Sequence, residues 1–175
     1  MKGFDKLDVR DLEGSAFRMI GDEWMIVTAS NEAGEYNSMT ASWGGLGVLW
    51  GEPVAFVFVR PQRYTHEFSE AGELATLSFF GGEHKKELSY FGIKSGRYTD
   101  KFKDMGFHPI KTDEGSIAVE EAATVLSCRK LYADEIKHEC FIDSEVDARA
   151  YPAHDYHTVY VYRIEGAYKK EQAKS

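Results

Sequence analysis

The chain has 175 residues, of which 43% are hydrophobic and 29% are charged, and its formal net charge is −8. This length and composition predict a single globular domain over residues 1–175. The acidic balance argues against nucleic acid as the partner, because phosphate backbones are bound by basic surfaces, but it allows a local basic pocket for one small anion.

Short runs rich in Val, Ile, Phe, Tyr and Trp, separated by Gly, Asn and Asp, are typical of β-strands. They predict six strands, at about residues 24–30, 37–43, 53–60, 74–80, 122–136 and 157–168. Residues 31–35 are expected to form the hairpin loop between the first two strands.

Three short helices are expected between the strands, at residues 65–71, 83–93 and 99–105. Thr65 and Thr99 are candidate N-caps, and Gly72 and Gly106 follow the first and third helices. Many consecutive strands without βαβ alternation predict a mostly antiparallel sheet closed into a barrel.

No segment predicts secretion or membrane insertion. The first eight residues contain no apolar signal, and the longest plain apolar run, residues 54–59, is too short to span a bilayer. Cys128 and Cys140 are too few for a disulfide framework, and no common zinc-ligand spacing connects them to the nearby histidines. We therefore expect a cytoplasmic protein with reduced thiols, no bound metal and no membrane partner.

Residues 44–51 are rich in glycine. Trp50 stands where a dinucleotide-binding fingerprint that starts at Gly45 would need glycine, and no Gly-Lys-Ser/Thr follows, as a phosphate-binding loop would require. We expect a loop that lets the backbone turn or approach another group closely.

The strand at residues 37–43 has a simple alternation. With a period of two, Ser38, Thr40 and Ser42 lie on one face, and Met39 and Ala41 lie on the other. The face of small hydroxyls is either an ordinary solvent-facing surface or a platform on which a flat polar ligand lies close to the backbone.

The segment Arg60–Thr65 joins a buried strand to a helix. A helix N-terminus attracts anions, and arginine adds bidentate geometry for phosphate. Two arginines and a threonine in one turn of an acidic protein favour an anion site over ordinary charge at the end of a strand.

Two further residues have alternative interpretations. Lys101 lies in a first helical turn, where it is either a solvated surface lysine or a cation placed for an anion. His157 opens the last strand close to Asp155 and is either a hydrogen-bonded structural residue or a residue with a tuned pKa.

Taken in order, these segments resemble the flavin reductase-like family, the FMN-binding split barrels, and more narrowly its flavoredoxin-like branch. The resemblance runs from about residue 15 to residue 168, and its matching stretches are Asn37–Trp43, Arg60–Thr65, Ser78–Phe80, Ser95–Arg97 with Lys101, and Asp155–His157. Reductases of this family often carry Gly-Asp-His before the last strands. Here His157 fits that tripeptide and the Asp position does not.

The resemblance implies a mostly β fold: a six-stranded antiparallel Greek-key split barrel with a few flanking short helices, homodimeric, with FMN near the subunit interface. It places the strand of Thr40 beside the isoalloxazine ring. It also implies that Arg60, Arg63 and Thr65 hold the ribityl phosphate. From its position after Ser95–Arg97, we expect Lys101 near N1 and O2 of the ring or at the phosphate. Residues 169–175 are expected to form a polar tail outside this core.

The FMN-binding residues expected on this basis are Asn37, Met39, Thr40, Ala41, Ser42, Trp43, Arg60, Pro61, Arg63, Tyr64, Thr65, Ser78, Phe79, Phe80, Ser95 and Lys101. His157 is the candidate catalytic residue. Large aromatic residues near this site are expected to belong mostly to the core, and some to a homodimer interface.

The leading hypothesis is an FMN-dependent oxidoreductase that uses NAD(P)H as reductant. One alternative is an electron carrier with tightly bound FMN that passes electrons to a partner protein. Another is a split barrel that binds a ligand other than flavin, because a fold does not fix a function.

Overall fold

The computed structural model of the chain describes residues 1–171. Within them the fold is mostly β, as predicted, with ten strands where six were expected. The strands are β1 (Phe4–Leu7), β2 (Met25–Ser30), β3 (Tyr36–Ala41), β4 (Gly44–Leu49), β5 (Glu52–Val59), β6 (Leu74–Phe79), β7 (Pro109–Lys111), β8 (Ile117–Val119), β9 (Thr124–Glu135) and β10 (Thr158–Lys170).

The α-helices of the described residues are short, as predicted. They are α1 (Tyr64–Ala71), α2 (Lys85–Ile93), α3 (Lys101–Met105) and α4 (Ser144–Ala150), and brief helical turns cover Val9–Asp11, Arg18–Asp22 and His138–Cys140. None of the helices within residues 1–171 is long and apolar enough to cross a membrane.

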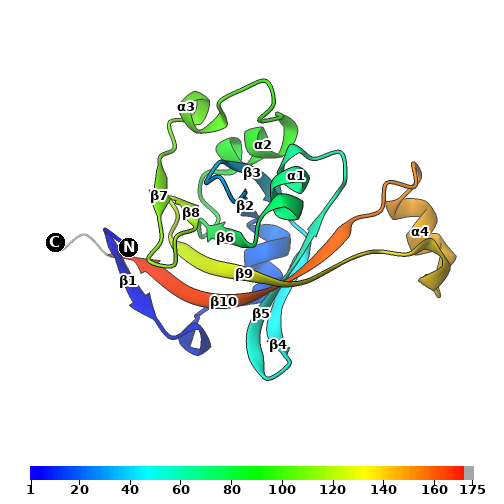
Figure 1. Ribbon diagram of the computed structural model, residues 1–175, viewed down its shortest axis with the longest axis horizontal. Coiled ribbons are helices and arrows are strands. Elements are labelled where there is room, and N and C mark those ends of the chain that lie inside the picture. Colours follow the sequence, from blue (N-terminus) through cyan, green and yellow to red (C-terminus); the bar gives the residue numbers. More distant parts are fainter. Residues whose placement is uncertain (172–175) are drawn as a thin grey trace.

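Eight strands form one antiparallel sheet that curls into a split barrel (Figure 1). The strand order is β3-β2-β6-β9-β10-β5-β4, and β1 pairs with the far end of β10. The end strands β3 and β4 do not pair with each other, which leaves the barrel split. Strand β10 joins the two halves because it pairs with β9 on one side and with β5 on the other.

The side-chain alternation of the strands creates two hydrophobic cores. Met25 and Val27 of β2 belong to the core inside the barrel. Ile26, on the opposite face of the same strand, belongs to a second core with Leu88 and Phe91 of α2. Because β2 is buried on both faces, α2 is held flat against the sheet, and its C-terminal end is fixed beside β3.

The glycine-rich segment is a strand and not the expected loop. Residues 44–49 form β4, and Trp50 and Gly51 make the turn into β5 with φ angles of 53° and 77°. The close approach predicted for this segment occurs at Gly44, where a Cβ would lie 2.8 Å from the carbonyl oxygen of Phe56. Glycines carry no side chains that could show the strand period, so the pattern alone did not reveal β4.

The predicted threonine caps are also corrected. Helix α1 begins at Tyr64, with Arg63 in the cap position, so Thr65 lies inside the first turn. Helix α3 is capped by Asp100, whose carboxylate accepts a hydrogen bond from the backbone of Lys103. Thr99 instead donates to the carbonyl oxygen of Ser95.

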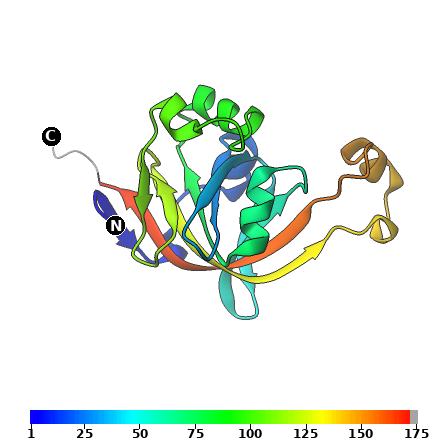
Figure 2. The ribbon, with the colours of Figure 1, turned by 45° about the horizontal axis from the view of Figure 1, so that its top comes forward.

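Residues 136–157, here called the arm, project from the barrel on the long ends of β9 and β10 (Figures 1 and 2). The arm contains α4, which the sequence analysis did not predict. Asp143 caps this helix by accepting a hydrogen bond from the backbone of Glu145. The arm is therefore an ordered extension of the barrel.

At the opposite end, β10 continues to Lys170 and pairs with β1. Residues 169–170 therefore belong to the sheet and not to the expected polar tail, because β1 supplies them with backbone partners. The end of that predicted tail, residues 172–175, lies outside the described residues.

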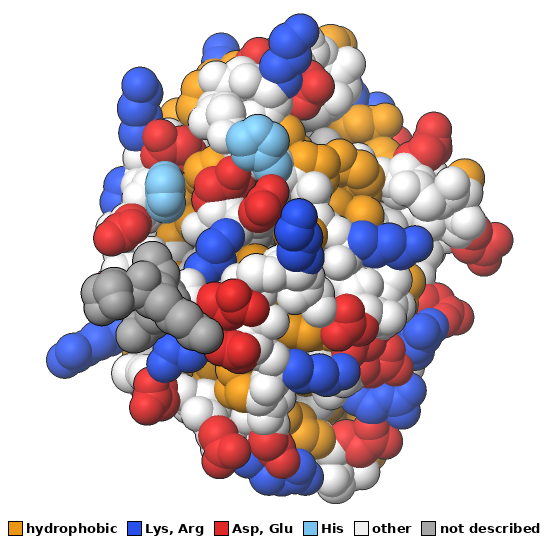
Figure 3. All heavy atoms as spheres, turned by 90° about the vertical axis from the view of Figure 1, so that its left-hand side faces the viewer, with side chains coloured by type: hydrophobic (Ala, Val, Ile, Leu, Met, Phe, Trp, Pro, Cys, Tyr) orange, Lys and Arg blue, Asp and Glu red, His pale blue; other side chains and the backbone are white. Residues whose placement is uncertain are grey.

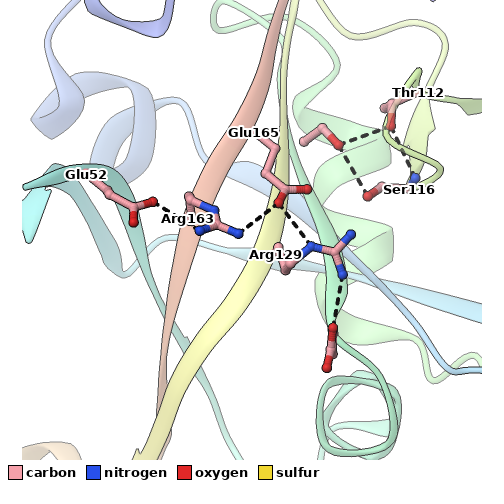
Figure 4. Close-up of polar contacts among 8 residues, drawn as sticks. Glu52, Thr112, Ser116, Arg129, Arg163 and Glu165 are labelled. Carbon is pink, nitrogen blue, oxygen red and sulfur yellow. Dashed lines mark hydrogen bonds and ion pairs between the residues drawn. The ribbon is translucent and has the colours of Figure 1, made fainter. Parts of the chain in front are cut away.

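Charged side chains of both signs mingle on the face of the molecule nearest the two termini (Figure 3). On the outer surface of the sheet, charged side chains form a row of ion pairs, here called the ladder (Figure 4). Arg163 pairs with Glu52 at 3.3 Å and with Glu165 at 3.2 Å. Arg129 pairs with Glu165 at 3.0 Å and with Glu73 at 3.0 Å. Each cation of this ladder has two acidic partners.

Candidate functional site

A cleft of about 410 Å³ opens where β3, the start of α1 and the segment after α2 meet. Its lining is rich in cations and in hydroxyl and amide groups, and no acidic side chain of residues 1–171 belongs to it. The lining residues are Asn37, Met39, Arg60, Gln62, Arg63, Tyr64, Thr65, Phe91, Ile93, Lys94, Ser95, Gly96 and Lys101.

The connection from β5 to α1 forms one wall of the cleft. The apolar strand ends at Val59, and the backbone N–H of Arg63 donates to the carbonyl of Arg60 as the chain turns into α1. The first turn of a helix has N–H groups without intrahelical partners, which favour anions. Thr65, in this turn, is buried and accepts a hydrogen bond from Asn37 Nδ2 at 2.7 Å, which ties α1 to β3.

The segment after α2 closes against the same place. A Cβ on Gly96 would lie 1.9 Å from Asn37 Oδ1, so this close approach requires glycine. The guanidinium of Arg97 lies 4.4 Å from the centre of the Tyr64 ring and pairs with Glu67. These contacts fix the segment after α2 to the start of α1, and so fix two walls of the cleft relative to each other.

Lys101 is a buried lysine that has no acidic partner within residues 1–171. Its ammonium group donates to the carbonyl oxygens of Ser38, Phe91 at 3.4 Å and Lys94 at 3.3 Å, and its side chain reaches the cleft from the first turn of α3. Burial, together with the nearby charge of Arg63, lowers the pKa of Lys101 to about 8. Of its two sequence interpretations, the solvated surface lysine is wrong because the residue is only 5% exposed.

Arg63 is the second cation of the cleft without an acidic partner among residues 1–171. Its guanidinium donates to the carbonyl oxygen of Gly92 at the end of α2. Burial and the neighbouring charge of Arg60 lower the pKa of Arg63, although arginine stays protonated. Two cations that face one cleft and repel each other create a site that an anion would stabilise.

Arg60 also lines the cleft, but its partners lie in the arm. Its guanidinium pairs with Asp155, donates to the carbonyl oxygen of Ala150 at 2.9 Å, and lies 5.3 Å from the centre of the Tyr151 ring. Gln62 donates to the same Asp155 carboxylate at 2.6 Å. The two arginines that were predicted to act together therefore have different surroundings, because Arg60 already has Asp155 as its counterion.

His157 is buried at the base of the arm, outside the lining of the cleft. Its Nδ1 lies 2.9 Å from the Tyr151 hydroxyl, and its ring centre lies 5.0 Å from that of Trp43. Burial, followed by the charge of Arg60, lowers the pKa of His157 to about 4. The imidazole is therefore neutral at pH 7.

The hydroxyl face of β3 is neither solvent-facing nor an open platform along its length. Thr40 donates to the carbonyl oxygen of Leu88 in α2, and Ser38 is buried against Thr28, with 2.8 Å between their hydroxyls. Helix α2 covers this face because Ile26 and its neighbours need an apolar partner on that side. Only Ser42 and Trp43, beyond the end of β3, are exposed.

The structure brings half of the predicted FMN-binding residues to the cleft and places the others elsewhere. Ala41 and Phe79 belong to the core inside the barrel, and Phe80 belongs to the second core. Ser78 is buried and accepts a hydrogen bond from the backbone of Val119 at 3.3 Å. Thr40, Ser42, Trp43 and the exposed Pro61 do not line the cleft.

Sequence reasoning missed several residues of the cleft. Gln62, Phe91, Lys94 and Gly96 line it, and so does Ile93, which is 76% exposed. For Ile93, Lys94 and Gly96, the signal that could have found them is their place between the end of α2 and Lys101.

The cleft fits a phosphate-bearing ligand on its own evidence. Arg63 and Lys101 present two positive charges beside the N-terminal turn of α1, and neither is paired with an acidic side chain among the described residues. A volume of about 410 Å³ lies within the range of small-molecule sites.

Comparison with solved structures shows the same fold in FMN-binding and flavin-reducing proteins. An FMN-binding domain of a flavin reductase-like enzyme from Shewanella baltica superposes with a TM-score of 0.68 at 15% identity, over 95% of this chain and 77% of that one. Flavoredoxin of Desulfovibrio vulgaris gives a TM-score of 0.66 at 20% identity, over 91% and 78% of the two chains.

A third structure is the NADH:FAD oxidoreductase SgcE6 of Streptomyces globisporus in complex with NAD and FAD fragments. It has a TM-score of 0.63 at 18% identity, over 84% of this chain and 74% of that one. No functionally curated protein is significantly similar to the chain. The family model of the flavin reductase like domain matches residues 17–175. The chain therefore belongs to the flavin reductase-like domain family.

Proposed function

We propose that the protein is a flavoprotein that binds FMN in the cleft and acts as an NAD(P)H-dependent flavin oxidoreductase. The observation that carries the proposal is a pair of cations in a chain of the flavin reductase-like family: Arg63 and Lys101 face one cleft, and neither has an acidic partner in the part of the chain that the structure describes. A phosphate monoester would satisfy both.

The residues of the chain would act mainly by binding and orientation. Arg63 and Lys101 hold the phosphate, and Thr65 and Asn37 fix the first turn of α1 against β3. Bound flavin would supply the hydride- and electron-accepting chemistry. The neutral His157 can donate or accept one hydrogen bond at Nε2, because Tyr151 engages its Nδ1.

A homodimer is part of this proposal. Trp43 and Trp50 are 47% and 61% exposed, and Ile142 of the arm is fully exposed. Tryptophan is enriched at protein interfaces, and an arm that projects beyond the barrel offers a surface that a second copy could cover. Light scattering at micromolar concentration tests this, and a stable monomer would contradict it.

The main rival is an electron carrier that keeps FMN bound and passes electrons to a partner protein. The structural similarity to flavoredoxin of Desulfovibrio vulgaris favours this second candidate function. Both functions need the same cleft, so they differ in reaction with the nicotinamide and not in flavin binding.

The test begins with the visible spectrum of the purified protein and with chromatography of any pigment released on denaturation. Bound or added FMN should be retained more tightly than riboflavin, which lacks the phosphate, and equal affinities would contradict the assignment of the cleft. Stopped-flow mixing of the FMN-loaded protein with NADH or NADPH then separates the two functions. Fast, saturable bleaching supports the oxidoreductase, and no bleaching supports the carrier.

A further inference from the structure

The two arginines that line the cleft have different partners. The guanidinium of Arg60 contacts three groups of the arm: Asp155, the carbonyl of Ala150 and the ring of Tyr151. Arg63 donates only to a backbone carbonyl and has no carboxylate partner among residues 1–171. A single acidic residue of the arm therefore decides which arginine keeps a free charge.

Asp155 is built into this position by two donors. One of its oxygens accepts hydrogen bonds from Arg60 and from Gln62, and both donors line the cleft. These bonds hold the pKa of the Asp155 carboxyl below its usual range, so the group is ionised at neutral pH. Its other oxygen is buried without a hydrogen-bond partner among residues 1–171.

The positive charge of Arg60 acts on titratable groups in and beside the cleft. It contributes to the lowered pKa of Arg63 and to that of His157, whereas the charge of Asp155 opposes it at His157. At His157, Asp155 thus opposes a positive charge that also acts on Arg63. The sequence differs from the Gly-Asp-His pattern of the family at this place. Asp155 is the first residue of the tripeptide Asp155–His157, whose histidine fits the pattern.

We propose that Asp155 is a specificity-determining residue that neutralises Arg60, so that the cleft holds a ligand phosphate with Arg63 and Lys101 alone. This inference rests on the proposed binding of FMN. The cleft then binds the phosphate more weakly than three free cations would. The flavin therefore exchanges more readily.

The test is the ratio of the dissociation constants of riboflavin and FMN in Asp155→Asn, measured by flavin fluorescence at low ionic strength. Removal of the counter-charge frees the field of Arg60, so FMN should bind roughly fivefold more tightly while riboflavin is unchanged. Damage to the arm would not tighten binding, which separates this role from a merely structural one. Asp155→Glu keeps the charge and should keep the wild-type ratio.

The double variant Arg60→Gln/Asp155→Asn tests the same idea by removing both charges of the ion pair, so that neither residue is left with an unpaired charge. It replaces the ion pair with a neutral hydrogen-bonding pair, and its FMN affinity should stay within about twofold of the wild type. If Arg60 itself held the phosphate, this variant would bind FMN about tenfold more weakly with riboflavin unaffected, and the proposal would be overturned. This variant also serves if Asp155→Asn fails to fold.

Asp8→Asn is the matched control. Asp8 is an aspartate paired with Arg10 at 3.5 Å, and it lies outside the cleft. The variant makes the same change in net charge and should leave both affinities unaltered. Unchanged or weaker FMN binding in Asp155→Asn overturns the inference about Asp155. Equal affinities of the wild-type protein for FMN and riboflavin would instead remove the proposed phosphate site itself.

Discussion

The two arginines of the outer ladder and the pair of Arg63 and Lys101 in the cleft lie in opposite electrostatic surroundings. In the ladder, glutamate partners raise the pKa of Arg129 and of Arg163 (Figure 4). In the cleft, burial and the charge of a neighbouring arginine lower the pKa of Arg63 and of Lys101. The direction of the shift distinguishes an arginine paired with carboxylates from a buried cation that has no carboxylate partner among residues 1–171.

The largest expected effect is a loss of FMN affinity at the cleft. Arg63→Ala should weaken FMN binding by about 1.5–3 kcal/mol, the usual size of a hydrogen bond to a charged group, and leave riboflavin binding unchanged. Arg129→Ala, in the ladder, is the matched control and should change neither affinity. Fluorescence titration of both flavins measures this, and equal losses for FMN and riboflavin would argue against a phosphate contact.

A smaller effect follows from the titration of Lys101, whose pKa is about 8. Below that pH the ammonium is charged and attracts the phosphate. Above it the amine is neutral, so FMN affinity should fall about fivefold between pH 7 and pH 9, and riboflavin affinity should not. Binding of the dianion should in turn raise the pKa of Lys101.

Lys101→Arg sharpens this prediction, because arginine keeps its charge throughout the range. The FMN affinity of this variant should be level from about pH 7 to about pH 9. A wild-type profile as flat as that of the variant would show that Lys101 does not titrate near the phosphate.

The smallest expected effect lies in the ladder. Arg129→Gln removes the pairs with Glu73 and Glu165, yet both are partly exposed to solvent and screened by salt. Urea unfolding should show a loss of at most about 1 kcal/mol, which shrinks further in high salt. A loss several times larger would mean that the ladder stabilises the fold much as a buried network does.

The outcome for individual elements shows what a local pattern can reveal. The alternation of β2 and β3 and the loop between them were predictable, because strand period and turn residues are local properties. Strand β4 was hidden because its glycines show no alternation, although they allow the close approach to β5. Helix α4 was missed because it packs on an arm that only the paired ends of β9 and β10 create.

The candidate site shows the same division. The position of Arg63 and Thr65 together at the start of a helix was predictable, since a strand that ends in arginines before a helix is a local arrangement. The resemblance added Ser95 and Lys101, which also line the cleft. The counterion of Arg60 was not predictable, because Asp155 lies far along the chain and meets it only through the pairing of β10 with β5.

The sequence by itself determined the class of fold, most strands, the three helices around the cleft and the cations that line it. These follow from side-chain period, turn chemistry and residue type, which act over a few neighbours. Only the tertiary structure decided that α2 covers the hydroxyl face of β3, that Lys101 is buried among carbonyl oxygens, and that Asp155 neutralises Arg60. Those outcomes depend on which distant groups share a desolvated volume, and the strength of a charge there is set by its surroundings.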